Sequence, residues 1–482
     1  MSADAVSTKP LVVDLDGTLL VGDVFRRQAA ELAFHRPWLF AGVMLSSGSK
    51  SRTKTRLAEV VPYDPADDVY RPEVLDLIQR YKKAGQKVFL ATAAAESVAE
   101  SVARHLGVFD GVFSSTPDHN LSRGKKRDRL LEAFPGGFDY VGNASADLPV
   151  WEAAETSWVV GPRAGQLIQR RRGALLPVPA DHRPSLLKGV IRALRPHQWA
   201  KSLLILLPLV ASQNVTEWSM WALALWAVAA FSIAASGNYL INDIVDQRHD
   251  RAHPTKRHRP IASGALPPFV ASGLALVLIA GGLLLAWQLS AAVGWVLVAY
   301  LVVSYLYSMV FKRWDSIDTV VLAVLYGVRV VAGAFAISVT LSPWMISFTF
   351  FLFYSLAVGK RVAELLAVPD GDGKVNGRGY HPSDQRVLLP LGVGSGVAST
   401  LVLLLYLFSS TADVQYGNPL VLFVAGPVYL AWVAHFWTET SRGRMDQDPV
   451  VWALKSRQSF VLGVLFFAVF VVAQTLVGLG GL

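Results

Sequence analysis

Apolar and polar positions follow two different patterns along this chain, and the change of pattern divides it into two parts. In the first part the apolar runs are short, as in 11–15 and 87–92, and helical stretches with one apolar face, such as 72–83, separate them. After residue 201 the apolar runs are long and uncharged. The pattern predicts an α/β domain with a Rossmann-like parallel sheet, followed by an all-α polytopic membrane bundle.

Nine apolar runs in the second part approach the length that crosses the hydrocarbon core of a membrane. We expect transmembrane helices at roughly 202–216, 218–240, 269–287, 293–311, 319–339, 343–358, 387–408, 418–437 and 460–480. The connections at 241–268, 312–318, 359–386 and 438–459 carry 5, 2, 5 and 4 Lys or Arg, and the alternate connections carry none. Because cytoplasmic loops are rich in these residues, we expect a multi-pass protein of a bacterial-type plasma (inner) membrane with its N-terminal domain in the cytoplasm.

The composition agrees with this division. The chain is 52% hydrophobic, and it contains no cysteine, which excludes a disulfide framework, thiolate metal sites and a cysteine nucleophile. Lys plus Arg against Asp plus Glu is 23 to 22 in residues 1–181 and 22 to 14 in residues 182–482, so almost all of the net charge of +9 belongs to the membrane part. We attribute it to loop orientation and phosphate binding, and we expect no nucleic-acid partner.

The domain boundaries are predicted from the same changes of composition. The first domain is expected at 1–160 and the integral membrane domain at 186–482. Between them, residues 161–185 are rich in Gly and Pro and contain three consecutive arginines, Arg170 to Arg172. This segment is predicted to be a basic linker near an anionic membrane surface.

The first chemical motif comes at the end of the apolar run 11–15. Asp14-Leu-Asp16-Gly-Thr places two carboxylates at the carboxyl edge of a parallel strand, where open α/β sheets keep their active sites. Asp14 would attack phosphorus to form an aspartyl-phosphate, and Asp16 would protonate the leaving alcohol and then activate water. The pentapeptide resembles motif I of the haloacid dehalogenase-like (HAD) superfamily, and the resemblance covers about residues 10–160.

This resemblance implies further residues of a phosphatase site. Thr92, at the end of the run 87–92, stands where the family binds phosphate, and Lys125 stands where the family neutralises the phosphoryl group. Residues 19–70 would form a small helical cap that screens substrates. The alternative is a simple turn after a strand, with Thr92 and Lys125 as ordinary surface residues. Four motifs in the family's order favour the phosphatase.

The resemblance also implies a Mg²⁺ site in the first domain. The fourth motif reads Gly-Asn143-Ala-Ser-Ala-Asp147, in which Asn143 replaces the acidic residue that family members often have. Asp14, Asp147 and the carbonyl of Asp16 would hold the ion, with Asn143 beside them. The missing charge at Asn143 leaves open a weakened site or a regulatory relic.

A second acidic motif follows the run 218–240. Asn242, Asp243, Asp246 and Asp250 recur at helical spacing, so their side chains are predicted to face one side. Such a group is costly without cations, and Mg²⁺ bridging the carboxylates and a diphosphate is the natural one. The alternative is a solvated loop that only orients the membrane helices.

Three basic residues, Lys256, Arg257 and Arg259, follow this acidic motif in the sequence. They would hold further phosphate oxygens, the arginines in bidentate fashion.

The acidic motif and the nine predicted spans resemble the UbiA-type intramembrane prenyltransferase superfamily over residues 190–480. The resemblance implies a Mg²⁺-dependent transferase that binds a diphosphate within a helical bundle open to lipid. Three segments, 195–201, 246–264 and 359–364, look like the decaprenyl-phosphate phosphoribosyltransferase branch of that superfamily. The second aspartate-rich motif that the aromatic prenyltransferases usually carry is replaced here by Gly-Lys-Arg-x-x-Glu at 359–364.

The resemblance therefore implies transfer of 5-phosphoribosyl from its 1-diphosphate to a polyprenyl phosphate, a step in cell envelope biosynthesis. Lys201, Lys360, Arg361 and Glu364 would bind the substrates, and the first domain would remove the 5-phosphate from the product. The alternative is transfer of a prenyl group from a prenyl diphosphate to an aromatic acceptor. A different class, a transporter or scaffold, is disfavoured because the acids lie at the interface and not near the midplane. Arg329 lies inside the fifth predicted span, where it would hold either a phosphate or an acidic partner.

Overall fold

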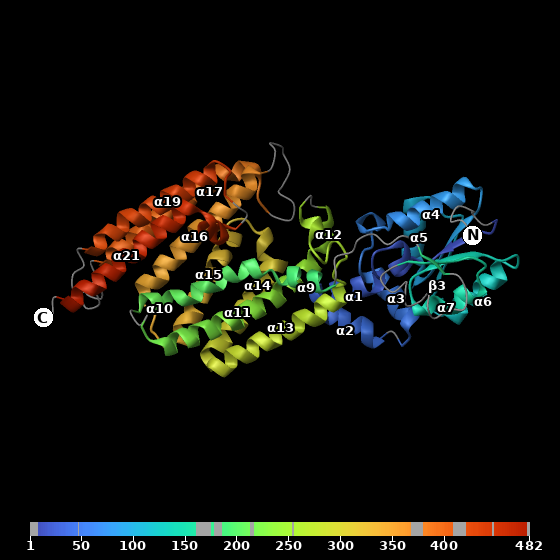
Figure 1. The fold of residues 1–482 in the computed structure, drawn as a ribbon, viewed down its shortest axis with the longest axis horizontal. Helices are drawn as coiled ribbons and strands as arrows, with labels where there is room; N and C mark the ends of the chain where they lie inside the picture. Colours follow the sequence, from blue (N-terminus) through green and yellow to red (C-terminus); the bar gives the residue numbers. More distant parts are fainter. Residues whose placement is uncertain are drawn as a thin grey trace. The chain divides into compact units, whose positions relative to one another are not determined.

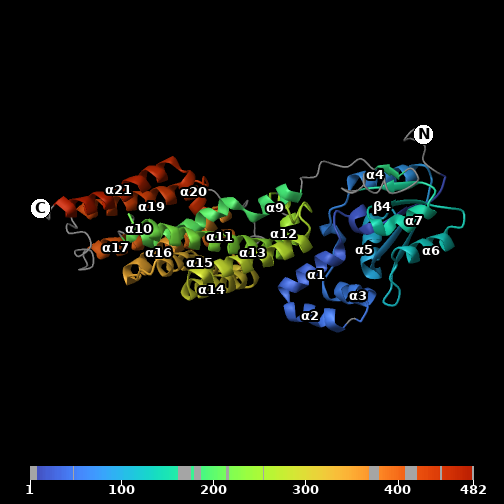
Figure 2. The same cartoon turned by 60° about the horizontal axis from the view of Figure 1, so that its bottom comes forward.

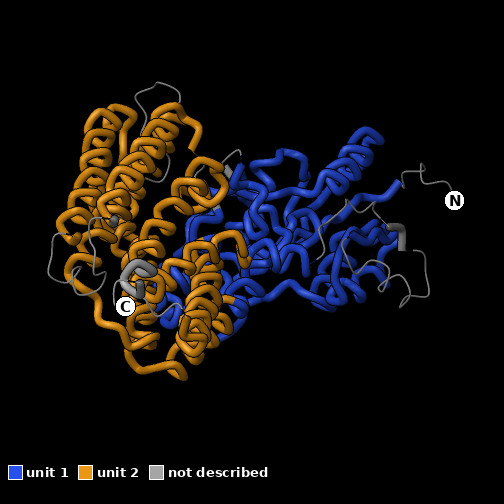
Figure 3. Tube along the Cα trace, turned by 60° about the vertical axis from the view of Figure 1, so that its left-hand side comes forward, with its two compact units in different colours: residues 1–193, 243–274 blue, residues 194–242, 275–482 orange. Residues whose placement is uncertain are grey.

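The computed structural model describes residues 8–46, 48–160, 175–177, 186–212, 216–252, 255–367, 379–407, 421–445 and 448–479. The chain forms two compact units, one of Met1–Ala193 with Asp243–Leu274 and one of Leu194–Asn242 with Ala275–Leu482 (Figure 3). The predicted linker at 161–185 lies outside the described residues apart from 175–177.

A parallel sheet of six strands is the centre of the first unit (Figure 1). The strands are β1 (Leu11–Val13), β2 (Val88–Ala95), β3 (Gly111–Ser115), β4 (Asp139–Gly142), β5 (Ser157–Val159) and β6 (Leu175–Pro177). Their order is β3-β2-β1-β4-β5-β6, and every neighbouring pair is parallel. The predicted parallel α/β fold is confirmed. The chain runs outward in both directions from β1, so the carboxyl end of β1 is the switch point where such sheets place their sites.

Helices cover both faces of this sheet. Alternate residues of β1 point to opposite faces, so each face packs against a different pair of helices. Leu11 and Val13 pack with α4 (Pro72–Lys83) and α5 (Glu96–Leu106). Val12 packs on the other side with α6 (Gly124–Ala133) and α7 (Leu148–Ala153). All three β1 residues are fully buried, which explains why the strand is apolar throughout.

Three helices lie between β1 and α4. They are α1 (Val24–His35), α2 (Pro37–Ser46) and α3 (Lys50–Val60), and they enclose a small core of Leu32, Val43, Leu57 and Val61. The side chains of Asp23 and Ser49 accept hydrogen bonds from the first turns of α1 and α3, which explains where these helices begin. We call residues 24–60 the cap.

Residues 243–274 belong to the first unit through contacts with the cap and the segments beside it. The Arg251 guanidinium donates to the Asp67 carbonyl at 2.6 Å and lies 3.5 Å from the Asp68 carboxylate. Arg26 of α1 lies 5.8 Å from the centre of the Phe269 ring. Gly264 has φ +77°, and a Cβ atom there would lie 2.7 Å from Val21 Cγ1, so the close approach requires glycine.

Six helices among the described residues are long and apolar enough to cross a membrane, or seven if a bent pair forms one span. The six are α11 (Trp218–Val245), α13 (Pro268–Leu289), α14 (Ala291–Met309), α15 (Ile317–Ala336), α16 (Pro343–Leu366) and α17 (Gln385–Leu407). The bent pair is α20 (Pro449–Lys455) with α21 (Arg457–Leu479), which meet at 85°. Helices α14 to α17 lie side by side in succession (Figure 2).

The predicted count of nine spans is not confirmed. The run at 202–216 forms the 3₁₀ segment η4 (Pro196–Leu206) and the short helix α10 (Leu207–Ala211), because Pro208 starts a new helix there. The described part of the run at 418–437 forms the 3₁₀ segment η8 (Val421–Val424) and α19 (Ala425–Ser441), a helix of 17 residues. Length and apolar character alone did not reveal these breaks. The remaining helices near the acidic motif are short, α9 (Leu186–Leu194) and α12 (Gln247–Ala252).

Candidate functional sites

The first site lies where β1 ends. Asp14, the residue after β1, is buried, and its carboxylate accepts hydrogen bonds from Lys126 Nζ at 2.8 Å and from Thr18 Oγ1 at 3.1 Å. Asp147 follows the neighbouring strand β4, and its carboxylate lies 3.8 Å from the same Lys126 Nζ. The two carboxylates therefore converge on one ammonium group at the switch point of the sheet.

Asp147 is held in place by its own loop. The backbone N–H groups of Asn143 and Ala144 donate to Oδ2 at 3.1 and 3.0 Å, and the Tyr140 hydroxyl donates to Oδ1 at 2.8 Å. A Cβ atom on Gly142 would lie 2.7 Å from Asp147 Oδ2, so only glycine lets the carboxylate turn back over the strand.

The protonation of the two motif I carboxyls differs. Burial raises the pKa of Asp14 to about 6, an effect that the Lys126 charge opposes and the Asp147 charge reinforces. Burial raises the pKa of Asp16 to about 8, with a further increase from the charge of Asp23. Asp16 also accepts a hydrogen bond from the Val24 backbone at 2.8 Å, which fixes its position. Near neutral pH Asp16 is therefore largely protonated and suited to act as an acid, and Asp14 is largely ionised.

The structure brings Lys126, and not the predicted Lys125, into contact with Asp14. Both residues lie in the first turn of α6, where a step of one residue turns the side chain by about 100°. Lys126 is buried against the sheet, and Lys125 is exposed. Burial alone would lower the pKa of Lys126, but the charges of Asp14 and Asp147 outweigh burial and raise the pKa, so the ammonium stays charged.

The other predicted residues of this site lie close to motif I. Thr92 is fully buried in β2, and its hydroxyl accepts a hydrogen bond from the Ala94 backbone at 3.0 Å. The Asn143 side chain lies against Gly17, where a Cβ atom would be 2.1 Å from Nδ2. Sequence reasoning missed Lys54 of the cap, which donates to the Ala93 carbonyl and whose charge interacts with Asp16. No pattern in the sequence could have identified Lys54, because its position depends on how the cap folds back over the sheet.

The donor set of this site fits a Mg²⁺ ion. Two buried carboxylates converge and a backbone carbonyl, that of Asp16, belongs to the same loop, and hard oxygen donors of this kind are the ligands of Mg²⁺. In the described part of the chain, no group of three or more acidic or histidine side chains is arranged to hold a metal. The two converging carboxylates are those of Asp14 and Asp147, and the Asn143 amide lies against Gly17 of motif I.

The second site is formed by the acidic motif after α11. Arg259 Nη1 donates to Asp243 Oδ1 at 3.1 Å and to Asp250 Oδ2 at 2.6 Å, and the exposed fractions of the two acids are only 1% and 3%. The Gln247 side chain donates to the Ile261 carbonyl at 3.1 Å and ties α12 to the loop that carries Arg259. Two buried carboxylates thus point at one cationic group, so their arrangement suits a cation.

Other residues predicted for this site are less enclosed. Asn242 and Asp246 are partly exposed, and the charge of Asp246 acts on Asp250. Lys256 and Arg257 lie in η5 (Lys256–His258), where Arg257 is exposed. The structure brings Arg259, and not Arg257, to the carboxylates.

A cluster of cations lies in the second unit. Lys201 of η4 is paired with Asp448, the residue that caps α20, and lies 5.8 Å from the Tyr326 ring. Arg329 of α15 lies 5.9 Å from the same ring, and its Nη2 donates to the Tyr300 hydroxyl at 2.8 Å. Lys360 of α16 interacts electrostatically with Lys201 and Asp448. We call Lys201, Arg329 and Lys360 the cation cluster.

The cation cluster has more positive than negative charge. Arg329 is buried, and its Nε has no hydrogen-bond partner. Within the described ranges, Asp448 is the one carboxylate that forms an ion pair with a member of the cluster. A buried cation without a counterion is costly, so an anion is expected to complete this site.

Arg361 lies in a separate buried network. Its guanidinium contacts the carboxylates of Asp318 and Glu364 and donates to the Tyr307 hydroxyl at 2.8 Å. Asp318 and Arg361 are almost fully buried. Protein groups thus use the donors of Arg361, and the network joins α14, α15 and α16.

Comparison with known proteins gives a family for each part of the chain. Residues 203–454 match the model of the UbiA prenyltransferase family, and residues 11–152 match that of the haloacid dehalogenase-like hydrolases. The chain belongs to the UbiA prenyltransferase family. Its N-terminal part is a HAD-like domain, and the apolar helices of its UbiA part make it a multi-pass membrane protein.

Three similar proteins illustrate the extent of the likeness. The uncharacterized protein y4nM of Sinorhizobium fredii is 34% identical over 96% of this chain and 91% of its own length. Decaprenyl-phosphate phosphoribosyltransferase of Mycolicibacterium smegmatis is 38% identical over 185 residues, 38% of this chain and 58% of that protein. A UbiA homolog from Archaeoglobus fulgidus, solved with GPP and Mg²⁺, covers 60% of this chain and 99% of its own, with 15% identity and a TM-score of 0.45.

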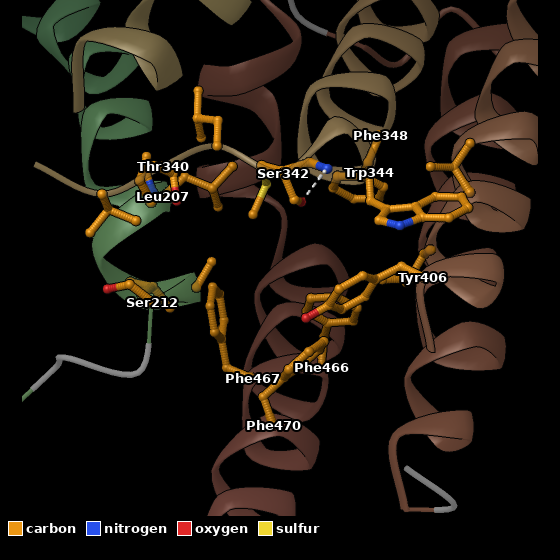
Figure 4. A pocket seen from close by; sticks show the side chains of 18 of the residues that line it. Leu207, Ser212, Thr340, Ser342, Trp344, Phe348, Tyr406, Phe466, Phe467 and Phe470 are labelled. Atoms are coloured by element: carbon orange, nitrogen blue, oxygen red, sulfur yellow. Dashed lines mark hydrogen bonds between the residues drawn. The ribbon is translucent and has the colours of Figure 1, made fainter. Parts of the chain in front are cut away.

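The UbiA part also contains an apolar cavity of about 240 Å³ (Figure 4). Its walls come from α10, the segment before α16, and the helices α17 and α21. Its lining includes four aromatic residues, Tyr406, Phe466, Phe467 and Phe470. Ser342, which also lines it, is polar but uncharged. Such a cavity suits a hydrocarbon chain and not a phosphate.

Proposed function

We propose that the UbiA part transfers 5-phosphoribosyl from 5-phosphoribosyl 1-diphosphate to a polyprenyl phosphate, and that the HAD-like domain then removes the 5-phosphate. The observation that carries the proposal is the cation cluster, in which Lys201 and Arg329 are buried, Lys360 is partly buried and one carboxylate forms an ion pair, so that it suits an anionic acceptor. A lipid phosphate would use these charges more fully than the single carboxylate of an aromatic acid, because a phosphate has more anionic oxygens. The named activity of the M. smegmatis relative supports the same substrates.

In the proposed transfer, the leaving group is a diphosphate. Asp243 and Asp250, with Asp246, would hold Mg²⁺, which neutralises the charge of the leaving diphosphate. Arg259, which bridges the two carboxylates, is placed to donate to a diphosphate oxygen. The bond from ribose C1 to the diphosphate breaks as an oxygen of the lipid phosphate attacks C1. Lys201, Arg329 and Lys360 would hold that lipid phosphate.

The phosphatase step would use the first site. Asp14 attacks the phosphorus of the 5-phosphate, and Asp16, protonated near neutral pH, gives its proton to the leaving ribose oxygen. Asp16 then takes a proton from water as the aspartyl-phosphate is hydrolysed. Lys126 neutralises the phosphoryl group throughout. Phosphoribosyl transfer leaves a phosphomonoester and prenylation of an aromatic ring does not, so a fused phosphatase favours the ribosyl reaction.

We propose that the protein resides in a bacterial-type inner membrane with the HAD-like domain on the cytoplasmic side. The loops that carry Lys and Arg support this orientation. Soluble 5-phosphoribosyl 1-diphosphate would then reach the acidic motif directly from the cytoplasm.

The alternative function is prenyl transfer from a prenyl diphosphate to an aromatic acceptor. Membership of the UbiA family is compatible with it, since the paired carboxylates Asp243 and Asp250 would serve either diphosphate. The charge of the cation cluster and the fused HAD-like domain favour the ribosyl reaction.

The proposal is tested with the purified full-length protein in Mg²⁺, a polyprenyl phosphate and 5-phosphoribosyl 1-diphosphate labelled in the ribose. We expect label to enter the organic phase, followed by release of inorganic phosphate from the labelled lipid. If no label enters the lipid while a prenyl diphosphate and an aromatic acid are consumed, the alternative function is correct.

Two neighbouring lysines of α6, Lys125 and Lys126, provide a test of the phosphatase site. We expect Lys126→Met to lower hydrolysis of p-nitrophenyl phosphate by about 100-fold, because the group that neutralises the phosphoryl oxygens is lost. Lys125→Met changes an exposed residue of the same helix and is expected to alter the rate by about twofold at most. Equal losses in both variants would contradict the assignment of Lys126.

A further inference from the structure

Helix α2 of the cap has an uncovered apolar face. It reads Pro-Trp-Leu-Phe-Ala-Gly-Val-Met-Leu-Ser and contains no charged residue. Trp38, Ala41 and Leu45 share one face at helical spacing, and the exposed fractions of Trp38 and Leu45 are 74% and 87%. Val43 on the opposite face is buried, with Leu39 and Phe40 packed beside it. The exposed face is therefore not needed for the core of the cap.

The surroundings of α2 are basic. Residues 24–60 contain seven Lys or Arg and two Glu, a net charge of +5. Arg36 and Lys50, close to the two ends of α2, are both exposed. An uncharged apolar helix with an exposed Trp and with cations close to both of its ends can lie in the surface of an anionic membrane, its apolar side chains in the acyl boundary and the cations at the headgroups.

The cap also contacts the first residues of a candidate membrane span, and these residues belong to the same unit as the cap. Arg26 of α1 lies over the ring of Phe269, in the first turn of α13. Residues 268–274 of α13 belong to the first unit together with the cap. The end of a span lies at the membrane surface, so this contact keeps the cap close to lipid headgroups.

We infer that α2 lies in the surface of the membrane, with Trp38, Ala41 and Leu45 among the acyl chains and Arg36 and Lys50 against anionic headgroups. The occupant of the exposed face is thus the bilayer. This inference goes beyond the proposed function, because it concerns where the cap lies and not which reaction occurs. Its consequence is that the HAD-like domain stays beside the membrane surface, where the phosphate of a membrane lipid lies.

The chain contains no cysteine, so single cysteines report on single positions. We would label Leu45→Cys, and separately Ala41→Cys, with an environment-sensitive nitrobenzoxadiazole dye in full-length protein in phosphatidylglycerol-containing nanodiscs. Asp128→Cys, at an exposed position of α6, is the matched control. We expect the dye at positions 41 and 45 to emit at shorter wavelength than at 128, to lose intensity with doxyl-labelled lipids and to resist aqueous iodide.

Two results would overturn the inference. Quenching by iodide and not by doxyl lipid would place α2 in water, and protection from both quenchers would show that protein covers it. Since dye emission requires no turnover, the inference is tested even if the proposed reaction is wrong.

A second measurement connects α2 to catalysis and rests on the proposed function. Leu45→Gln is expected to raise KM for a lipid-linked phosphomonoester several-fold and to leave hydrolysis of p-nitrophenyl phosphate unchanged. An equal loss on both substrates would mean that the variant damages the cap itself, and would contradict a membrane role for this face.

Discussion

Asp250→Asn is expected to lower the rate of phosphoribosyl transfer to lipid by about 1,000-fold. The Asp250 carboxylate is buried and converges with that of Asp243 on one cationic position. Asn has nearly the same volume but no charge, so the site would bind a divalent cation weakly and the leaving diphosphate would keep its full charge. The measurement is the initial rate of label entering the organic phase at saturating 5-phosphoribosyl 1-diphosphate.

The matched control for Asp250→Asn is Glu217→Gln. Glu217 is exposed, beside the opposite end of α11 from the acidic motif, so its loss changes the charge of the chain equally without touching the site. We expect the control to retain a rate within about twofold of the unchanged protein. A transfer rate in Asp250→Asn close to that of the control would show that these carboxylates do not hold the leaving group.

The second large effect is expected at the other site. Asp14→Asn removes the nucleophile and should abolish phosphate release, a loss of at least about 10,000-fold. Transfer of label to lipid should stay unchanged, since Asp14 belongs to the HAD-like domain and the acidic motif has its own carboxylates. The lipid product is then expected to accumulate with its 5-phosphate, which thin-layer chromatography and mass spectrometry would identify.

Asp128→Asn serves as the control for Asp14→Asn, because Asp128 is an exposed acid of α6 in the same domain. It should release phosphate at the normal rate. If Asp14→Asn stops transfer as well as hydrolysis, the two sites do not act separately. If it stops neither, the HAD-like domain is the regulatory relic that Asn143 in the fourth motif would allow.

Local patterns along the chain were sufficient for the α/β fold of the first part. Strands β1 and β2 are apolar because both faces of the sheet are covered, so a short apolar run already identifies a buried parallel strand. Asp14 and Asp16 follow such a run directly, and the carboxyl ends of parallel strands all lie at the same edge of the sheet. The position of the first site was therefore predictable from residues 11–18.

Side-chain direction was not predictable in the same way. Lys125 and Lys126 are neighbours in sequence, and only the packing of α6 on the sheet decides that Lys126 faces Asp14. Likewise, the basic residues after the acidic motif looked equivalent, but the turn tied by Gln247 brings Arg259 to the carboxylates. These choices depend on contacts between segments distant in sequence, which no local pattern contains.

The amino-acid order by itself thus predicted the two candidate sites, because the acidic motifs and the apolar runs are local patterns and each has a local physical meaning. Tertiary structure decided which charges act together. Arg361 forms an ion pair with Asp318 of another helix, whereas Arg329 lies, like Lys201, beside the Tyr326 ring and has one nitrogen without a hydrogen-bond partner. The reason is that burial makes every charge depend on its neighbours in space, and those neighbours are set only when the helices pack.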